Sequence, residues 1–282
     1  MELLQQYTFQ IVALGTVMLG LVCGVIGTFA VLRQESLLGD GVAHSTLPGV
    51  VAGFLLTGVK DTTVLLLGAI CTACLSEWIM YKTSQKGVRF DAALATILAT
   101  FFGFGTVLLT RVQSMENAGQ AGLNTFIFGQ AVTMMQSDIW VMAICGTCIV
   151  GGVIILWKEL SLTVFDPIEA QLMGIPVSKV RFFYRAALVV TIVIGIRTVG
   201  VILISSLLIG PAMIGRQWTH SLRTLVIIAA ICGSVVAFMG TFVSALWGNL
   251  PTGPIIIIVM TGMILLSLVL ANGKRLMRRC LG

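Results

Sequence analysis

Long apolar runs, each about the length of a membrane-crossing helix, dominate this sequence. A helix needs about 20 predominantly apolar residues to cross the hydrocarbon core of a bilayer. The chain has 282 residues, of which 57% are hydrophobic and only 10% are charged, whereas soluble domains carry roughly a quarter charged residues. Because the runs are continuous and do not alternate, we expect helices and not a membrane β-barrel. The sequence therefore predicts an all-α polytopic membrane protein with a single transmembrane domain over residues 1–282.

Seven of these runs are each predicted to cross the membrane once. A further apolar stretch, residues 186–215, is too long for one crossing, and both of its flanks are basic. We predict that it forms a hairpin of two segments, about 186–197 and 199–215, with the first shorter than a normal crossing. This gives eight to nine crossings in total. The seven single crossings are residues 10–32, 37–58, 62–81, 91–110, 138–157, 224–247 and 255–271.

The distribution of basic residues indicates how the chain is oriented. With nine crossings and the N-terminus outside, 14 of the 17 Lys and Arg residues fall on the cytoplasmic side, as the positive-inside rule requires. We therefore expect an outer N-terminus and a cytoplasmic C-terminus. Basic flanks of helices in lipid also account for the net charge of +6 without a nucleic-acid partner. The first residues lack the basic region of a cleavable signal peptide.

Asp40 and His44 are the ionisable residues that most need an explanation. They lie four residues apart within an apolar stretch, so on a helix both side chains share one face. Ionisable groups at membrane depth are costly and usually face a cavity, a partner or an ion. A carboxylate and an imidazole suit divalent zinc, manganese or iron. The competing interpretation is that Asp40 caps its helix and His44 is an ordinary interfacial residue. The residues themselves leave both open.

The longest cytoplasmic segment, residues 158–184, contains a short helix with signals at both ends. Asp166 is expected to cap it, Pro167 fits its first position, and Glu169 adds a favourable charge to its first turn. Gly174 is expected to end it. One interpretation is a simple surface helix, and the other is a protruding helix that docks into a cytoplasmic partner. Capping at both ends favours docking.

Several other features receive simpler interpretations. Residues 111–137 are expected to form an outer loop followed by a short helix near the membrane surface. Glu77 is expected to pair with Lys82 or to extend toward water. Arg197 is placed at the turn of the hairpin. Two C-x-x-C pairs lie in apolar segments where thiolates are disfavoured, so we interpret them as small packing residues. These pairs are Cys71 with Cys74 and Cys145 with Cys148.

The sequence also excludes several activities. It has no G-x-x-x-x-G-K-[ST] loop, so the chain has no P-loop of its own for ATP. It has no H-E-x-x-H and no G-x-S-x-G, and its two histidines are far apart. These absences disfavour an ATPase, a zinc protease of this type and a hydrolase with a G-x-S-x-G nucleophile.

Four blocks of the sequence resemble the transmembrane permeases of zinc, manganese and iron ABC importers, the ABC-3 family. A weaker fifth block is residues 247–258, and residues 121–131 are most similar to the manganese-leaning branch. One departure is Pro211 to Gly215, which reads PAMIG where many members read PAATA. The four blocks are residues 31–50, 123–139, 165–177 and 199–215.

This resemblance implies a transport subunit and not an enzyme, with no permanently bound cofactor. It implies a bacterial cell-membrane permease that pairs with a second, identical or homologous permease and a cytoplasmic ABC ATPase dimer. An extracellular metal-binding protein would supply its cargo, a manganese, zinc or iron ion. The family's D-x-x-x-H motif falls on Asp40 and His44, which it assigns to metal passage. Its ATPase-coupling helix falls on Phe165 to Gly174, including Asp166, Pro167, Glu169 and Ala170. The alternative is an ATPase-independent secondary transporter or channel. An intramembrane metalloenzyme is disfavoured because the chain has few histidines and no nucleophile constellation.

Overall fold

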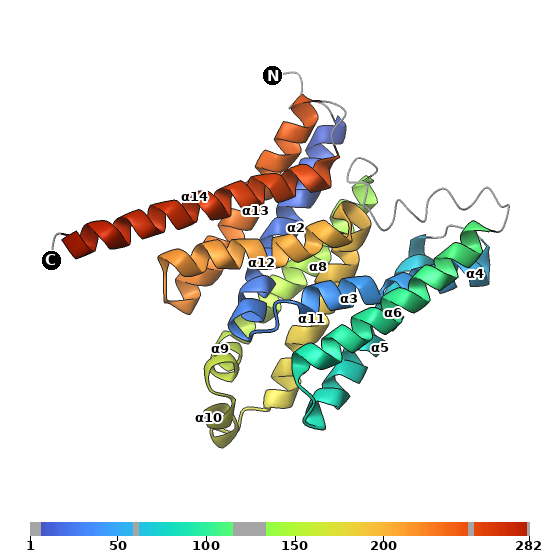
Figure 1. The fold of residues 1–282 in the computed structure, drawn as a ribbon, viewed down its shortest axis with the longest axis horizontal. Coiled ribbons are helices and arrows are strands. Elements are labelled where there is room, and N and C mark those ends of the chain that lie inside the picture. Colours follow the sequence, from blue (N-terminus) through green and yellow to red (C-terminus); the bar gives the residue numbers. More distant parts are fainter. Residues whose placement is uncertain (1–6, 59–61, 115–133, 248–250, 281–282) are drawn as a thin grey trace. The chain divides into compact units, whose positions relative to one another are not determined.

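The computed structural model describes residues 7–58, 62–114, 134–247 and 251–280, and within these ranges the regular structure is entirely helical (Figure 1). The short helix predicted near the end of the 111–137 loop lies outside the described residues. The helices are α2 (Tyr7–Leu32), α3 (Leu38–Ser45), α4 (Leu47–Thr57), α5 (Thr62–Gln85), α6 (Phe90–Gln113), α8 (Gln136–Ile155), α9 (Trp157–Phe165), α10 (Pro167–Leu172), α11 (Val177–Val199), α12 (Val201–Trp218), α13 (Leu222–Leu246) and α14 (Thr252–Cys280).

Among the described residues, six helices are long and apolar enough to cross a membrane: α2, α5, α6, α8, α13 and α14. They coincide with six of the predicted single crossings. In lipid each backbone N–H and C=O needs a partner within the protein, and a helix supplies these bonds within one segment. The most apolar part of α2 is 72% buried within the protein, against 22% for α6, α8 and α14. Helix α2 is therefore an inner helix of its bundle.

The first of two compact units contains residues 1–36, 131–181 and 206–282, and α2 is its central helix. Helix α13 packs along α2 in the opposite direction, because Gly20 lies against Gly233 and Gly24 lies against Ala229. Helix α8 runs parallel to α2 on another side. A hydrogen bond between Tyr7 and Gln136 joins the beginnings of α2 and α8.

The second unit contains residues 37–130 and 182–205, and it holds the Asp40–His44 region. Helices α4 and α5 pack antiparallel and closely, because Gly49 lies directly against Gly68. Helix α3 packs on α5 and α6. The buried Ser45 and Ser76 hydroxyls lie 2.7 Å apart and link α3 to α5. These contacts hold α3 between the longer helices of this unit.

Two expectations about the helices are wrong. The predicted continuous crossing 37–58 is divided at Thr46 into α3 and α4, since Pro48 has no N–H for the helical bond to the carbonyl of His44. The first hairpin segment is not short, because α11 has 23 residues and begins at Val177. The basic stretch ahead of residue 186 continues the helix, and Tyr184 and Arg185 are buried in it. The predicted break falls at Gly200, whose φ is 87°.

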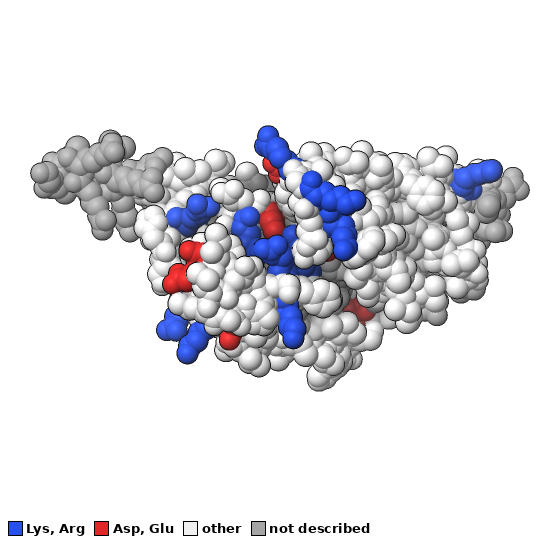
Figure 2. All heavy atoms as spheres, turned by 90° about the horizontal axis from the view of Figure 1, so that it is seen from below, with Lys and Arg blue, Asp and Glu red and all other residues white. Residues whose placement is uncertain are grey.

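Charged side chains occupy little of the surface. The space-filling view shows a mostly uncharged surface on which Lys and Arg gather in a few places (Figure 2). Large apolar side chains are exposed along the membrane-crossing helices, among them Leu67 and Trp78 on α5 and Trp140 on α8. Such a surface suits a lipid environment.

Candidate functional site

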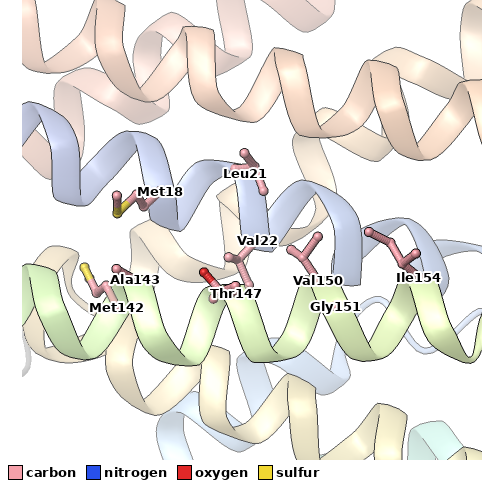
Figure 3. A pocket seen from close by; sticks show the side chains of 10 residues that line it. Met18, Leu21, Val22, Met142, Ala143, Thr147, Val150, Gly151 and Ile154 are labelled. Atoms are coloured by element: carbon pink, nitrogen blue, oxygen red, sulfur yellow. The ribbon is translucent and has the colours of Figure 1, made fainter.

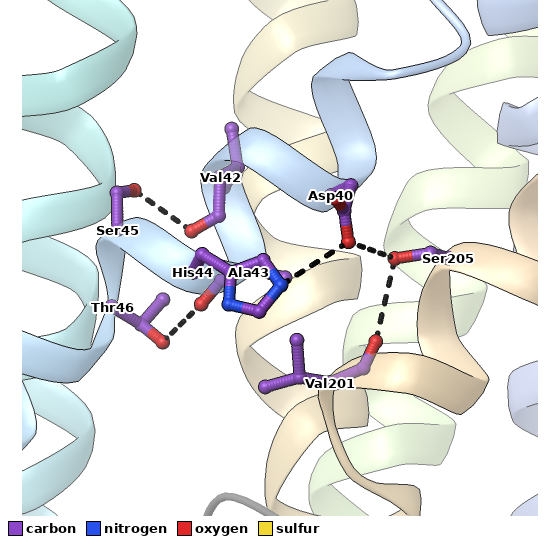
Figure 4. Close-up of polar contacts among 8 residues, drawn as sticks. All are labelled: Asp40, Val42, Ala43, His44, Ser45, Thr46, Val201 and Ser205. Carbon is purple, nitrogen blue, oxygen red and sulfur yellow. Dashed lines mark hydrogen bonds and ion pairs between the residues drawn. The ribbon is translucent and has the colours of Figure 1, made fainter. Parts of the chain in front are cut away.

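Asp40 and His44 lie on one face of the short helix α3, in its first and last turns respectively. Atom Nε2 of His44 is 3.5 Å from Oδ1 of Asp40 (Figure 4). The side chains are 26% exposed for His44 and 40% exposed for Asp40. The pair is therefore neither sealed in the protein interior nor fully exposed at its surface, which leaves room for a small ligand to reach both groups.

The interpretation of Asp40 as a helix cap is wrong. The N-cap of α3 is Leu37, and no side chain caps this end of the helix. Oδ1 of Asp40 instead accepts a hydrogen bond from Ser205 and lies beside His44. The carboxylate is thus directed toward other side chains and away from its own backbone N–H groups.

Two neighbours of this pair were not identified from the sequence. The hydroxyl of Ser205, near the start of α12, lies 3.2 Å from Oδ1 of Asp40 (Figure 4). The ring of Phe102, on α6, meets the His44 ring edge to face, with centroids 4.9 Å apart. Ser205 and Ser206 are the only hydroxyl residues in the block 199–215, and polar groups in an apolar segment often mark function. Nothing in the sequence indicated Phe102.

The backbone after His44 is held by its own hydroxyl groups. Ser45 donates a hydrogen bond to the carbonyl of Val42 at 2.8 Å, and Thr46 donates to the carbonyl of Ala43 at 2.7 Å (Figure 4). Side-chain bonds of this kind bend helices locally. Together with Pro48 they fix the break at which α3 ends and α4 begins.

The pair by itself supplies one oxygen and one nitrogen to a metal ion. In the part of the chain that the structure describes, no three His, Cys, Asp or Glu side chains converge on one point. A cation at this site would complete its coordination with water, backbone carbonyls or hydroxyl groups. Incomplete coordination suits an ion that must leave again.

The other ionisable residues and the cysteines that the sequence analysis considered lie outside the Asp40–His44 site. The expected pairing of Glu77 with Lys82 is wrong. Glu77 instead forms a buried ion pair with Arg185 of α11, in which Nη1 of Arg185 donates to Oε1 of Glu77 at 2.5 Å. His220 is exposed after the end of α12. The packing interpretation of the cysteines is wrong for three of the four in the C-x-x-C pairs, because the thiols of Cys71, Cys74 and Cys148 are exposed.

A group of exposed apolar side chains lies on and beside α10, in the segment 158–184 that was predicted to be cytoplasmic. The predicted capping is confirmed: the Asp166 carboxylate accepts hydrogen bonds from the N–H groups of Ile168 and Glu169, at 3.0 and 2.9 Å. Gly174 ends the helix with φ 78°, and its N–H bonds the carbonyl of Gln171. Ala170 is fully buried against the protein. The exposed apolar side chains are Phe165, Ile168, Leu172 and Met173.

A separate apolar pocket of about 350 Å³ lies between α2 and α8 in the first unit (Figure 3). Its lining includes Met18 and Leu21 from α2 and Met142 and Ile154 from α8, with Thr147 as its one hydroxyl residue. It has no ionisable residue in its lining. This pocket therefore lacks the ligands that a metal ion needs.

The apolar helices define a helical membrane protein, and the half-buried acid–imidazole pair is its candidate ion-binding site. The sequence model of the ABC 3 transport family matches residues 5–271, and the chain belongs to this family.

Relatives and a solved structure agree with this membership. The zinc transport system membrane protein TroC of Treponema pallidum (strain Nichols) is 45% identical over 96% of this chain and 91% of its own length. The manganese transport system membrane protein MntC of Bacillus subtilis (strain 168) is 38% identical over 97% of this chain and 63% of its own length. A structure of PsaBC from Streptococcus pneumoniae in complex with Fab matches with a TM-score of 0.80 at 28% identity, covering 94% of this chain and 92% of that one.

Proposed function

We propose that this chain is the membrane-spanning permease subunit of an ATP-driven importer of divalent transition-metal ions, with manganese as its cargo. Zinc and iron are the alternative cargoes, and relatives named for zinc and for manganese both match the chain. The observation that carries the proposal is the accessible Asp40–His44 pair in a member of a transport family. The pair supplies two ligands to which a dehydrated cation can bind briefly as it passes among apolar helices.

The partners follow from the same proposal. ATP hydrolysis takes place on a cytoplasmic ABC ATPase dimer, a second permease completes the pathway, and an extracellular metal-binding protein delivers the ion. The chain crosses a bacterial cell membrane eight to nine times, with its N-terminus outside. Packing directions within each unit support this: α13 runs antiparallel to α2, and α4 runs antiparallel to α5, as alternate crossings require.

Metal content of cells tests the site. Asp40→Ala and His44→Ala each remove one of the two proposed ligands, so we expect at least a tenfold loss of metal accumulation, measured by mass spectrometry of washed cells. Thr191→Ala is the control, since it removes a buried hydroxyl that bonds the carbonyl of Ala187 in its own helix and leaves the pair in place. Accumulation at the wild-type level in both ligand variants refutes the assignment, provided that each co-purifies with the ATPase.

Helix α10 is the proposed contact with the ATPase. Its exposed apolar side chains are typical of a surface that another protein covers, and its capping keeps so short a helix rigid. We expect Ile168→Asp and Leu172→Asp to lose the ATPase on affinity purification of the permease. Gln171→Asp is the control, because it adds the same charge to the same helix and removes no apolar side chain. Retention of the ATPase by both apolar-to-charged variants would contradict this contact.

A further inference from the structure

Ser205 stands between two acceptors that compete for its single hydroxyl proton. Its Oγ is 3.2 Å from Oδ1 of Asp40 and 3.3 Å from the carbonyl oxygen of Val201, one turn earlier in α12 (Figure 4). A hydroxyl carries one proton and two lone pairs. When the proton turns to Val201, a lone pair of Oγ is free to face the space beside Asp40 and His44.

We infer that Ser205 is a third ligand of the transported cation, in addition to Asp40 and His44. The inference rests on the proposed function, because it takes the cation to pass at this pair. A cation that binds the Asp40 carboxylate competes with the serine proton for the same oxygen. The hydroxyl group then rotates and donates its hydrogen bond to the Val201 carbonyl, which is already within hydrogen-bond distance. A lone pair of Oγ is then free to coordinate the ion.

The distances among the donor atoms suit this role. Ligand atoms that lie about 2.0–2.2 Å from one ion are about 2.8–3.1 Å from each other in octahedral geometry and about 3.3–3.6 Å in tetrahedral geometry. Oδ1 of Asp40 is 3.2 Å from Oγ of Ser205 and 3.5 Å from Nε2 of His44. Both separations lie within the limits that these two geometries together set for neighbouring ligands of a single ion. Little movement of the side chains is therefore needed to bind one.

Most hydroxyls of this chain show a simpler pattern, which separates Ser205 from them. Serine and threonine in apolar helices commonly bond the carbonyl one turn earlier, as Thr191 does with Ala187 and Thr28 does with Gly24. Ser205 makes that bond and also reaches a carboxylate on another helix. The second contact is the one that a purely local role does not require.

A third oxygen also bears on which metal is carried. Oxygen ligands suit manganese, whereas sulfur and nitrogen ligands favour zinc and other softer ions. A set of carboxylate oxygen, hydroxyl oxygen and one imidazole nitrogen is therefore weighted toward manganese. Replacing the hydroxyl by a thiol should move the preference toward soft ions such as cadmium.

Three substitutions in the assembled transporter test the inference. The measurement is ATP-dependent uptake of radioactive manganese. Two quantities are determined for each variant: the manganese concentration that gives half-maximal uptake, and the cadmium concentration that inhibits uptake by half. We expect Ser205→Ala to raise the half-saturating concentration by about tenfold while ATPase assembly persists, and Ser205→Thr to restore it. We expect Ser205→Cys to strengthen inhibition by cadmium by at least tenfold relative to Ser205→Ala. Thr191→Ala serves as the control, because its hydroxyl bonds the carbonyl of Ala187 in its own helix; it should leave the half-saturating concentration, the cadmium inhibition and the ATPase assembly unchanged.

The outcomes separate this inference from the proposed function. Wild-type uptake by Ser205→Ala, or identical cadmium inhibition of the Ala and Cys variants, overturns the ligand role of Ser205 and leaves the Asp40–His44 site standing. Wild-type uptake by Asp40→Ala and by His44→Ala overturns the proposed site itself. A role for Ser205 that is only structural predicts no change of metal preference in Ser205→Cys.

Discussion

Glu77 and Arg185 show, at the scale of single residues, how charges are accommodated among these apolar helices. Their side chains are only 11% and 10% exposed, and they form a close ion pair between α5 and α11. The Arg185 guanidinium also lies 5.5 Å from the centre of the Tyr81 ring, in position for a cation–π contact. Charge, hydrogen bonding and the aromatic ring together offset the cost of removing both groups from water.

Breaking this pair on one side should destabilise the protein strongly. Glu77→Leu or Arg185→Met leaves a buried charge without its main partner, which costs about 3–5 kcal/mol, whereas the double variant should regain most of that loss. Thermal unfolding in detergent measures this. Arg89→Met is the control, because Arg89 and Asp91 form an exposed pair at 3.8 Å, and exposed pairs contribute little. Equal melting temperatures for the single variants and wild type would show that the pair is not a stabilising contact.

The site residues differ in how far the sequence predicts them. Asp40 and His44 could be named as candidates because two ionisable groups four residues apart are costly at membrane depth, although their spacing alone left the capping interpretation of Asp40 open. Ser205 is 165 positions from Asp40, and a lone serine in an apolar helix is usually explained by a bond to its own backbone. Only its hydrogen bond to Asp40 in the folded chain assigns it to the site. The partner of Glu77 was missed for the same reason, since Arg185 is 108 positions away.

At the scale of helices, the contact between α2 and α13 depends on glycine. A Cβ at Gly20 would collide with the carbonyl of Gly233, and a Cβ at Gly24 would collide with the carbonyl of Ala229. The G-x-x-x-G of residues 20–24 therefore serves packing inside the chain. Close approach of this kind increases van der Waals contact where lipid provides no hydrophobic driving force between helices.

Single methyl groups should therefore separate these two helices. We expect Gly20→Ala and Gly24→Ala to destabilise the protein by about 1–3 kcal/mol through overpacking, seen as a lower melting temperature. Gly103→Ala on α6 is the control, since no atom lies within 4 Å of the added Cβ. Melting temperatures that fall as far for Gly103→Ala as for the α2 variants would argue against the packing explanation.

Helix positions were predicted better than helix ends. Apolar run length located the six helices of the described residues that are long and apolar enough to cross a membrane, because lipid leaves the backbone few alternatives. The break at Thr46 was missed because a proline can either bend a helix or divide it, and hydroxyl bonds from Ser45 and Thr46 contribute to the result. The start of α11 was missed because its basic first turns look like a loop, although Val177 and Val180 are buried.

At the scale of the whole molecule, the account requires one orientation in the membrane. In the proposed orientation, which follows from the distribution of basic residues, the start of α6 and the end of α12 lie on the cytoplasmic side. In a cysteine-free background, Gln113→Cys at the end of α6 should react with an impermeant thiol reagent added to intact cells. His220→Cys, exposed after α12, should react only after permeabilisation. Labelling of the two positions in the reverse order would invert the proposed topology.

The central claim is that ATP hydrolysed on a partner drives a metal ion past Asp40 and His44. Uptake of radioactive manganese into vesicles reconstituted with the purified permease–ATPase complex and its metal-binding protein tests it most directly. The account predicts accumulation that requires ATP, is insensitive to the collapse of ion gradients, and is lost in Asp40→Ala vesicles with the same ATPase content. Accumulation by the chain alone, driven by an ion gradient without ATP, would contradict it and identify a secondary transporter.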